Sequence, residues 1–117
     1  MILSDIHKLP AIDIDTYNDL ATILGDDFLD LIQDFRQQTS SGIDKMCAAL
    51  QANDLEQVCG IAHQLCSTTG NLGIMALSSL FRLIEKNIID ETAMDVTETT
   101  RALHDEFQRA ENELKLL

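Results

Sequence analysis

Four stretches of the chain repeat apolar residues every three or four positions, and this spacing restricts the fold more than any other feature. The stripes run through residues 26–52, 53–69, 77–88 and 95–117. An α-helix with 3.6 residues per turn brings such positions onto one face. Four amphipathic helices with short connections and no strand pattern favour an all-α fold, an antiparallel up-and-down four-helix bundle. An orthogonal array of helices is the alternative.

Helix start and stop residues give the expected boundaries. A short extra N-terminal helix spans about Asp15 to Leu24, with Gly25 as its stop, and covers one end of the bundle. The second helix begins near Asp26. The third opens with Asn53, which has Glu56 three residues later in a capping-box pattern. We therefore divide the chain into an irregular N-terminal arm (residues 1–14) and one bundle domain (15–117).

Composition excludes several classes of protein. The chain has 117 residues and 45% hydrophobic residues, enough for one domain with a core. Its net charge of −12 argues against nucleic acid and anionic membrane partners, which both require basic surfaces. No apolar run approaches the roughly 18 residues of a membrane span, and residues 1–15 do not resemble a signal peptide. The three cysteines lack the spacing of a disulfide framework. We expect a free-standing cytoplasmic monomer with free thiols.

His63 is the candidate functional residue. The apolar stripe of its helix is centred between Ala62 and Leu65, and the helical wheel places His63 roughly 130° from that centre, facing outward. Its neighbours on the helix surface, Gly60 and Ser67, are both small, so the imidazole is accessible to solvent or to a partner protein.

Gly60 needs its own explanation, because a glycine inside a helix costs about 1 kcal/mol relative to alanine. One interpretation is that a partner surface approaches closely beside His63. The other is tight packing of this helix against the first helix or the arm. The sequence alone favours neither.

The stretch AHQLCSTTGNLGIMALSSLFRLIEK, residues 62–86, resembles the core motif of histidine-containing phosphotransfer (HPt) domains. DDFLDLIQDF resembles the start of that family's second helix, and LQANDLEQVCGIAH its usual lead into the histidine. The resemblance covers residues 15 to 116. The positions that match the central motif are Ala62, His63, Leu65, Leu72, Gly73, Leu77, Leu80 and the closing pair Ile84-Glu85.

The resemblance implies a phosphorelay intermediate rather than an independent enzyme. His63 would accept a phosphoryl group from a phospho-aspartate on the receiver domain of a hybrid sensor kinase and pass it to a response regulator. An imidazole is largely neutral and nucleophilic near physiological pH. The chain would need no cofactor of its own, since the receiver domain supplies Mg²⁺. Gly60, Gln64, Ser67 and Asn71 would form the docking surface around His63.

Two positions depart from the family pattern. The family usually has lysine three residues after the histidine and glycine after that, where this chain has Cys66 and Ser67. Cys66 cannot offer the phosphoryl group a positive charge, whereas the Ser67 hydroxyl can donate a hydrogen bond to it. Arg82 should lie at a similar level on the next antiparallel helix. We therefore consider Cys66, Ser67 and Arg82 as supporting residues, with a solvated charge as the alternative for Arg82.

Two other functions are compatible with the sequence. The first is a degenerate HPt domain that docks without carrying phosphate, which the missing lysine favours. The second is a metal site formed by Cys59, His63 and Cys66, which lie along one flank of the helix. Three ligands on a single uninterrupted helix are an unusual zinc site, so we expect no metal.

Overall fold

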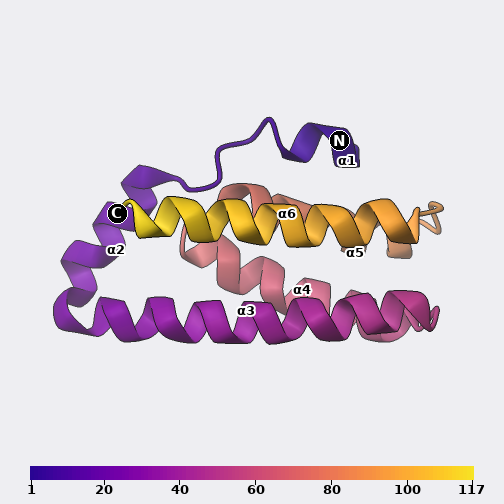
Figure 1. The fold of residues 1–117 in the computed structure, drawn as a ribbon, viewed down its shortest axis with the longest axis horizontal. Coiled ribbons are helices and arrows are strands. Elements are labelled where there is room, and N and C mark those ends of the chain that lie inside the picture. The colour runs from indigo at the N-terminus through magenta and orange to yellow at the C-terminus, as the bar shows by residue number, and fades with distance from the viewer.

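The computed structural model describes residues 1–117 as an all-α bundle, which confirms the predicted fold class (Figure 1). Four long helices form the bundle, with α3 and α6 in front of α4 and α5 in Figure 1. The helices are α1 (Leu3–Ile6), α2 (Ile14–Leu24), α3 (Phe28–Gln51), α4 (Leu55–Asn71), α5 (Met75–Ile89) and α6 (Val96–Lys115), with a 3₁₀ turn η1 (Gly25–Asp27) before α3. None of them combines the length and the apolar character that a membrane crossing needs.

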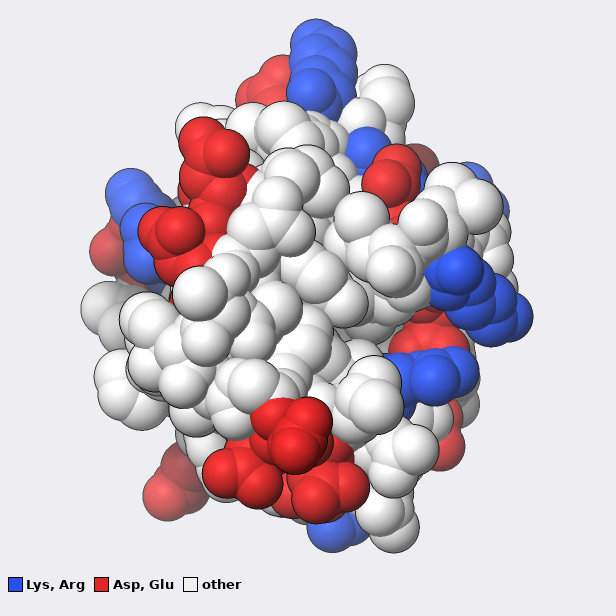
Figure 2. Space-filling view, turned by 90° about the vertical axis from the view of Figure 1, so that its left-hand side faces the viewer, with Lys and Arg blue, Asp and Glu red and all other residues white.

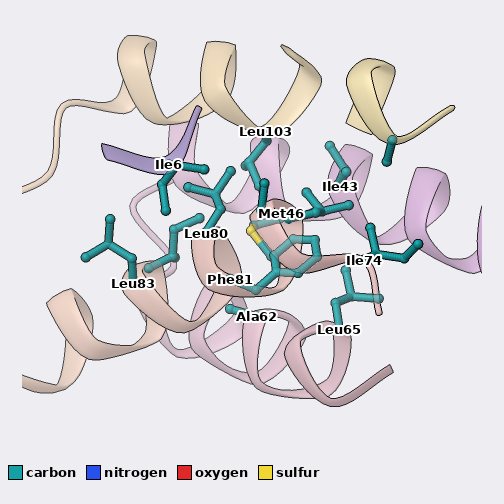
Figure 3. Packing of buried hydrophobic residues seen from close by; sticks show 14 of the residues in the cluster. Ile6, Ile43, Met46, Ala62, Leu65, Ile74, Leu80, Phe81, Leu83 and Leu103 are labelled. Atoms are coloured by element: carbon teal, nitrogen blue, oxygen red, sulfur yellow. The ribbon is translucent and has the colours of Figure 1, made fainter. Parts of the chain in front are cut away.

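The core consists of the predicted stripes. Side chains from all four long helices meet in it, including Met46, Leu65, Phe81 and Leu103 (Figure 3). Every position of the predicted α3 stripe is buried: Phe28, Ile32, Phe35, Thr39, Ile43, Met46 and Leu50. Predicted stripe positions are exposed only at helix ends. These are Leu55, Val96 and Leu117, which no neighbouring helix covers.

The N-terminal arm is more regular than predicted and packs against the bundle. It contains the one-turn helix α1, and Ile6 at its end is only 1% exposed. The carbonyls of Pro10 and Ala11 accept hydrogen bonds from the N–H groups of Ala76 (3.1 Å) and Met75 (3.0 Å). These N–H groups open α5 and have no partner within their own helix. The arm therefore caps α5.

Helix α6 holds the arm at His7, just after α1. Arg109 donates a hydrogen bond to the carbonyl of His7 (3.1 Å) and forms an ion pair with Glu106 (2.7 Å). Glu106 is buried although the sequence places a charge there. A buried carboxylate needs a paired cation, and Arg109 meets that need while it anchors the arm.

Aspartates cap three of the helices, and the predicted cap of α4 was wrong by one residue. Asp54, not Asn53, accepts a hydrogen bond from the N–H of Gln57 (3.3 Å). Asn53 instead adopts a φ of 54° and closes the turn after α3, a conformation that asparagine tolerates better than most residues.

Helix α3 also starts later than predicted, because residues 25–27 form the 3₁₀ turn.

The burial of Ile6 predicts that the arm contributes to stability. We expect Ile6→Ala to lower the free energy of unfolding by about 2–4 kcal/mol, since it leaves a cavity between the arm and the bundle. Ile2→Ala, at a position that is 64% exposed in the same arm, is the matched control and should cost less than about 0.5 kcal/mol. Urea titration followed by circular dichroism measures both. Equal midpoints for the two variants would contradict the packed arm.

Candidate functional site

His63 lies in the middle of α4 with its side chain 73% exposed, as the helical wheel predicted. The residues on either side of it along the stripe, Ala62 and Leu65, are buried in the core. The backbone of His63 is therefore fixed by packing, while its imidazole is exposed to solvent.

The imidazole is held by a carboxylate on the neighbouring helix. His63 Nδ1 lies 2.7 Å from Oε2 of Glu85 on α5, whose side chain is 22% exposed. An ionised carboxylate can only accept a hydrogen bond, so Nδ1 carries the proton and donates it. The neutral ring then has its lone pair on Nε2. The contact thus selects the tautomer in which Nε2 carries the free lone pair.

Sequence reasoning matched Glu85 to the end of the family's apolar run but gave it no role in the site. The signal was available in the antiparallel arrangement of the second and third apolar stripes, residues 53–69 and 77–88. His63 and Glu85 stand on either side of the connection at residues 72–74, and α4 and α5 run back along each other from it. The pairing still depends on the helix register, which the sequence alone does not fix.

Cys66 is turned toward α5. It is half-buried, and its sulfur lies 3.8 Å from Oγ of Ser78, which also donates a hydrogen bond to the Cys66 carbonyl (3.1 Å). Ser78 is buried. The residue at the family's lysine position therefore helps to join the two helices, and its predicted supporting role toward a phosphoryl group stays a prediction.

The four residues predicted as docking contacts are all exposed: Gly60, Gln64, Ser67 and Asn71. A Cβ atom added at Gly60 would meet nothing within 4 Å. Tight packing inside the chain is therefore not the reason for this glycine. Of the two interpretations of Gly60, the one that remains is that a partner surface approaches closely beside His63.

This face also differs from the rest of the protein in charge. Helix α4 carries one charged side chain, Glu56, in a chain with 20 acidic residues. Gln64 borders a surface hollow whose α3 side includes Gln37, Gln38, Ser41 and Lys45, and no acidic residue lines this hollow. The end of the bundle that carries α2 and the C-terminus likewise has an uncharged centre, with acidic and basic side chains at its rim (Figure 2). Acidic side chains are therefore absent from the hollow beside Gln64 and from the centre of this end of the bundle.

Arg82 is exposed on α5 and forms neither an ion pair nor a side-chain hydrogen bond. It borders a shallow hollow with Ser79, Lys86 and Asn87. The structure places it one turn before Glu85, on the helix that contacts α4, but without a direct contact to His63.

The cysteines do not assemble a metal site in this structure. All three are free, and no group of three histidine, cysteine, aspartate or glutamate side chains is close enough to hold a metal ion. Burial raises the pKa of the Cys47 thiol, which keeps it protonated near neutral pH. Cys66 faces Ser78, and His63 faces Glu85.

The family model described as "Hpt domain" matches residues 30–113, which is most of the chain. The chain belongs to the Hpt domain family. Its fold matches the crystal structure of histidine-containing phosphotransfer protein B (HptB) from Pseudomonas aeruginosa PAO1 with a TM-score of 0.85. The match covers 92% of this chain and 93% of that chain at 20% sequence identity, so it establishes the fold of this Hpt domain. No curated protein matches the sequence.

The Glu85 contact predicts an unusual tautomer for His63. In ¹⁵N–¹H correlation spectra recorded at about pH 8.5, where imidazoles are neutral, we expect the Nδ1–H form to predominate at His63. Glu85→Ala should remove this excess. His7, which has no side-chain hydrogen-bond partner, serves as the control in the same spectrum. An unchanged His63 signal in the variant would show that Glu85 does not select the tautomer.

Proposed function

We propose that this Hpt domain is a phosphotransfer protein that carries a phosphoryl group on Nε2 of His63. The observation that carries the proposal is the hydrogen bond from Nδ1 to Glu85, combined with the exposure of the ring. It leaves a single nucleophilic nitrogen, oriented outward on a helix whose other side is packed in the core. The donor and the acceptor are receiver domains, first of a hybrid sensor kinase and then of a response regulator.

The bonds formed and broken in the transfer balance, and no further reactant is needed besides the two proteins. The Nε2 lone pair attacks phosphorus of the receiver's phospho-aspartate, and an N–P bond forms. The O–P bond breaks, and its electron pair stays on the aspartate as a carboxylate. Nδ1 keeps its proton, so the ring gains positive charge as the bond forms. Transfer to the second receiver is the same step in reverse.

Glu85 has two roles in this step. Its hydrogen bond orients the ring, and its negative charge stabilises the positive charge that develops on the imidazole. This is the relation that a buried carboxylate has to the histidine of a catalytic triad. The receiver contributes the bound Mg²⁺ and the groups that stabilise the transferring phosphoryl, which is the dominant requirement of such reactions.

The uncharged face of α4 is the docking surface in this proposal. Gly60, Gln64, Ser67 and Asn71 lie on it around His63 and present no carboxylate to the acidic phosphorylation site of a receiver. Like charges brought together across an interface oppose binding. The small size of Gly60 and Ser67 lets the receiver surface approach the ring.

Phosphotransfer from a phosphorylated receiver domain tests the proposal directly. We expect the wild-type chain to acquire acid-labile, base-stable phosphate, because N–P bonds have this stability pattern. His63→Gln should acquire none. His104→Gln removes another exposed histidine and should label as the wild type does. Labelling of His63→Gln would contradict the assignment of the acceptor.

Glu85→Gln separates the two roles of the carboxylate. The amide oxygen still accepts from Nδ1, so the tautomer should persist in the ¹⁵N spectrum. The negative charge is lost, so we expect transfer to slow about three- to tenfold, as for a partly exposed charge interaction. Glu85→Ala should be slower still, since it loses both effects. Equal rates for the wild type and both variants would contradict a role for Glu85 in the transfer.

A docking module without phosphotransfer is the second candidate function. The observation that favours it is the family's missing lysine, since Cys66 brings no charge to the site. Receiver binding in the absence of any labelling, with several receivers, would establish this function in place of the first.

A further inference from the structure

We propose that Arg82 supplies from α5 the positive charge that the family's lysine supplies from α4. This inference rests on the phosphotransfer function proposed above and names the residue that meets the incoming phosphoryl group. Because Cys66 stands where the family has lysine, Arg82 would supply the positive charge that the site otherwise lacks.

The charge balance of the site creates the need for a cation. A neutral imidazole beside the Glu85 carboxylate has a net charge of −1. A phosphoryl group on Nε2 adds about −2. Cys66 contributes no charge, and its sulfur faces Ser78. The ring keeps its Nδ1 proton and carries +1 once the N–P bond forms, so the phosphorylated site has a net charge of about −2, within a protein whose net charge is −12.

The register of α5 against α4 places Arg82 beside this site. Two side-chain contacts fix that register: Glu85 with His63, and Ser78 with Cys66. Arg82 comes three residues before Glu85 and four after Ser78, so it lies one turn from each on the same side of α5. It consequently lies alongside the segment of α4 between His63 and Cys66.

The guanidinium of Arg82 is also available. Four of the eight basic residues form ion pairs, namely Lys8, Arg36, Lys86 and Arg109. Of the remaining four, Lys45 lies on α3 and borders the hollow beside Gln64, Arg101 and Lys115 lie on α6, and only Arg82 lies on α5, the helix that carries Glu85. Its natural partner within the helix would be Glu85 at i+3, but the two form no ion pair, and Oε2 of Glu85 contacts His63 instead.

Arginine suits this role through its geometry. Its planar guanidinium donates two parallel hydrogen bonds to phosphoryl oxygens. In the unphosphorylated structure the side chain lies over the hollow that it shares with Ser79 and Lys86. It is exposed, and exposed side chains change rotamer within picoseconds to nanoseconds. The phosphoryl group would draw it toward His63.

Single-turnover transfer from a phosphorylated receiver, at low and high salt, tests the assignment. We expect Arg82→Gln to slow the transfer step about three- to tenfold at low salt, with a smaller effect at high salt because the charge is screened. It should also shorten the lifetime of the phosphohistidine on the isolated protein. Arg82→Lys should recover most of the rate. Arg101→Gln removes another exposed, unpaired arginine from α6 and is the matched control, with an expected change below about 1.5-fold.

The double variant Arg82→Gln/Cys66→Lys completes the test. A lysine at position 66 should restore the rate, because it returns the charge to the position the family uses. If Arg82→Gln and Arg101→Gln show the same rate of transfer while the wild type labels normally, the assignment of Arg82 is wrong and the proposed function stands. If Arg82→Gln only weakens receiver binding, Arg82 is a docking contact and the assignment is wrong as well. If the wild type acquires no phosphate, the proposed function itself fails.

Discussion

The packing of α4 against α5 is the contact on which both the fold and the site depend. It starts from the turn at Gly73, which has a φ of +76°. A Cβ atom there would lie 3.1 Å from the carbonyl oxygen of Asp13 and 3.0 Å from Cβ of Thr16, so both the dihedral angle and the space require glycine. From this turn the two helices run back along each other in one register. That register brings Ser78 to Cys66 and Glu85 to His63.

The ring of an exposed histidine normally rotates freely, and the contacts of His63 restrict this rotation. The backbone of His63 is fixed because Ala62 and Leu65 are in the core, and the ring is fixed by Glu85. Orientation is therefore achieved without burial. In the proposed transfer, a phosphoryl group attached to another protein would reach this nitrogen because the docking of two surfaces, rather than a pocket, brings the reacting atoms together.

The sequence predicts the bundle well because periodicity depends only on which face of a helix is covered. It predicted the outward direction of His63 for the same reason. Its failures concern contacts between segments. The cap at Asp54, the burial of Ile6 and the ion pair of Glu106 each depend on where another part of the chain lies. Glu85 belongs with them: its partner stands 22 residues away, and a shift of one residue in register would turn the carboxylate away from the imidazole.

Arg82 on α5 and the family's lysine on α4 differ in what holds each of them in position beside the histidine. A lysine three residues after the histidine keeps its place as long as α4 remains helical. Arg82 keeps its place only while α5 holds its register, and the start of α5 is capped by the carbonyls of Pro10 and Ala11. The arm is held in turn by Arg109 and by the buried Ile6. In this chain the electrostatics of the site would therefore depend on the N-terminal arm, although the arm lies outside the part that the Hpt family model matches.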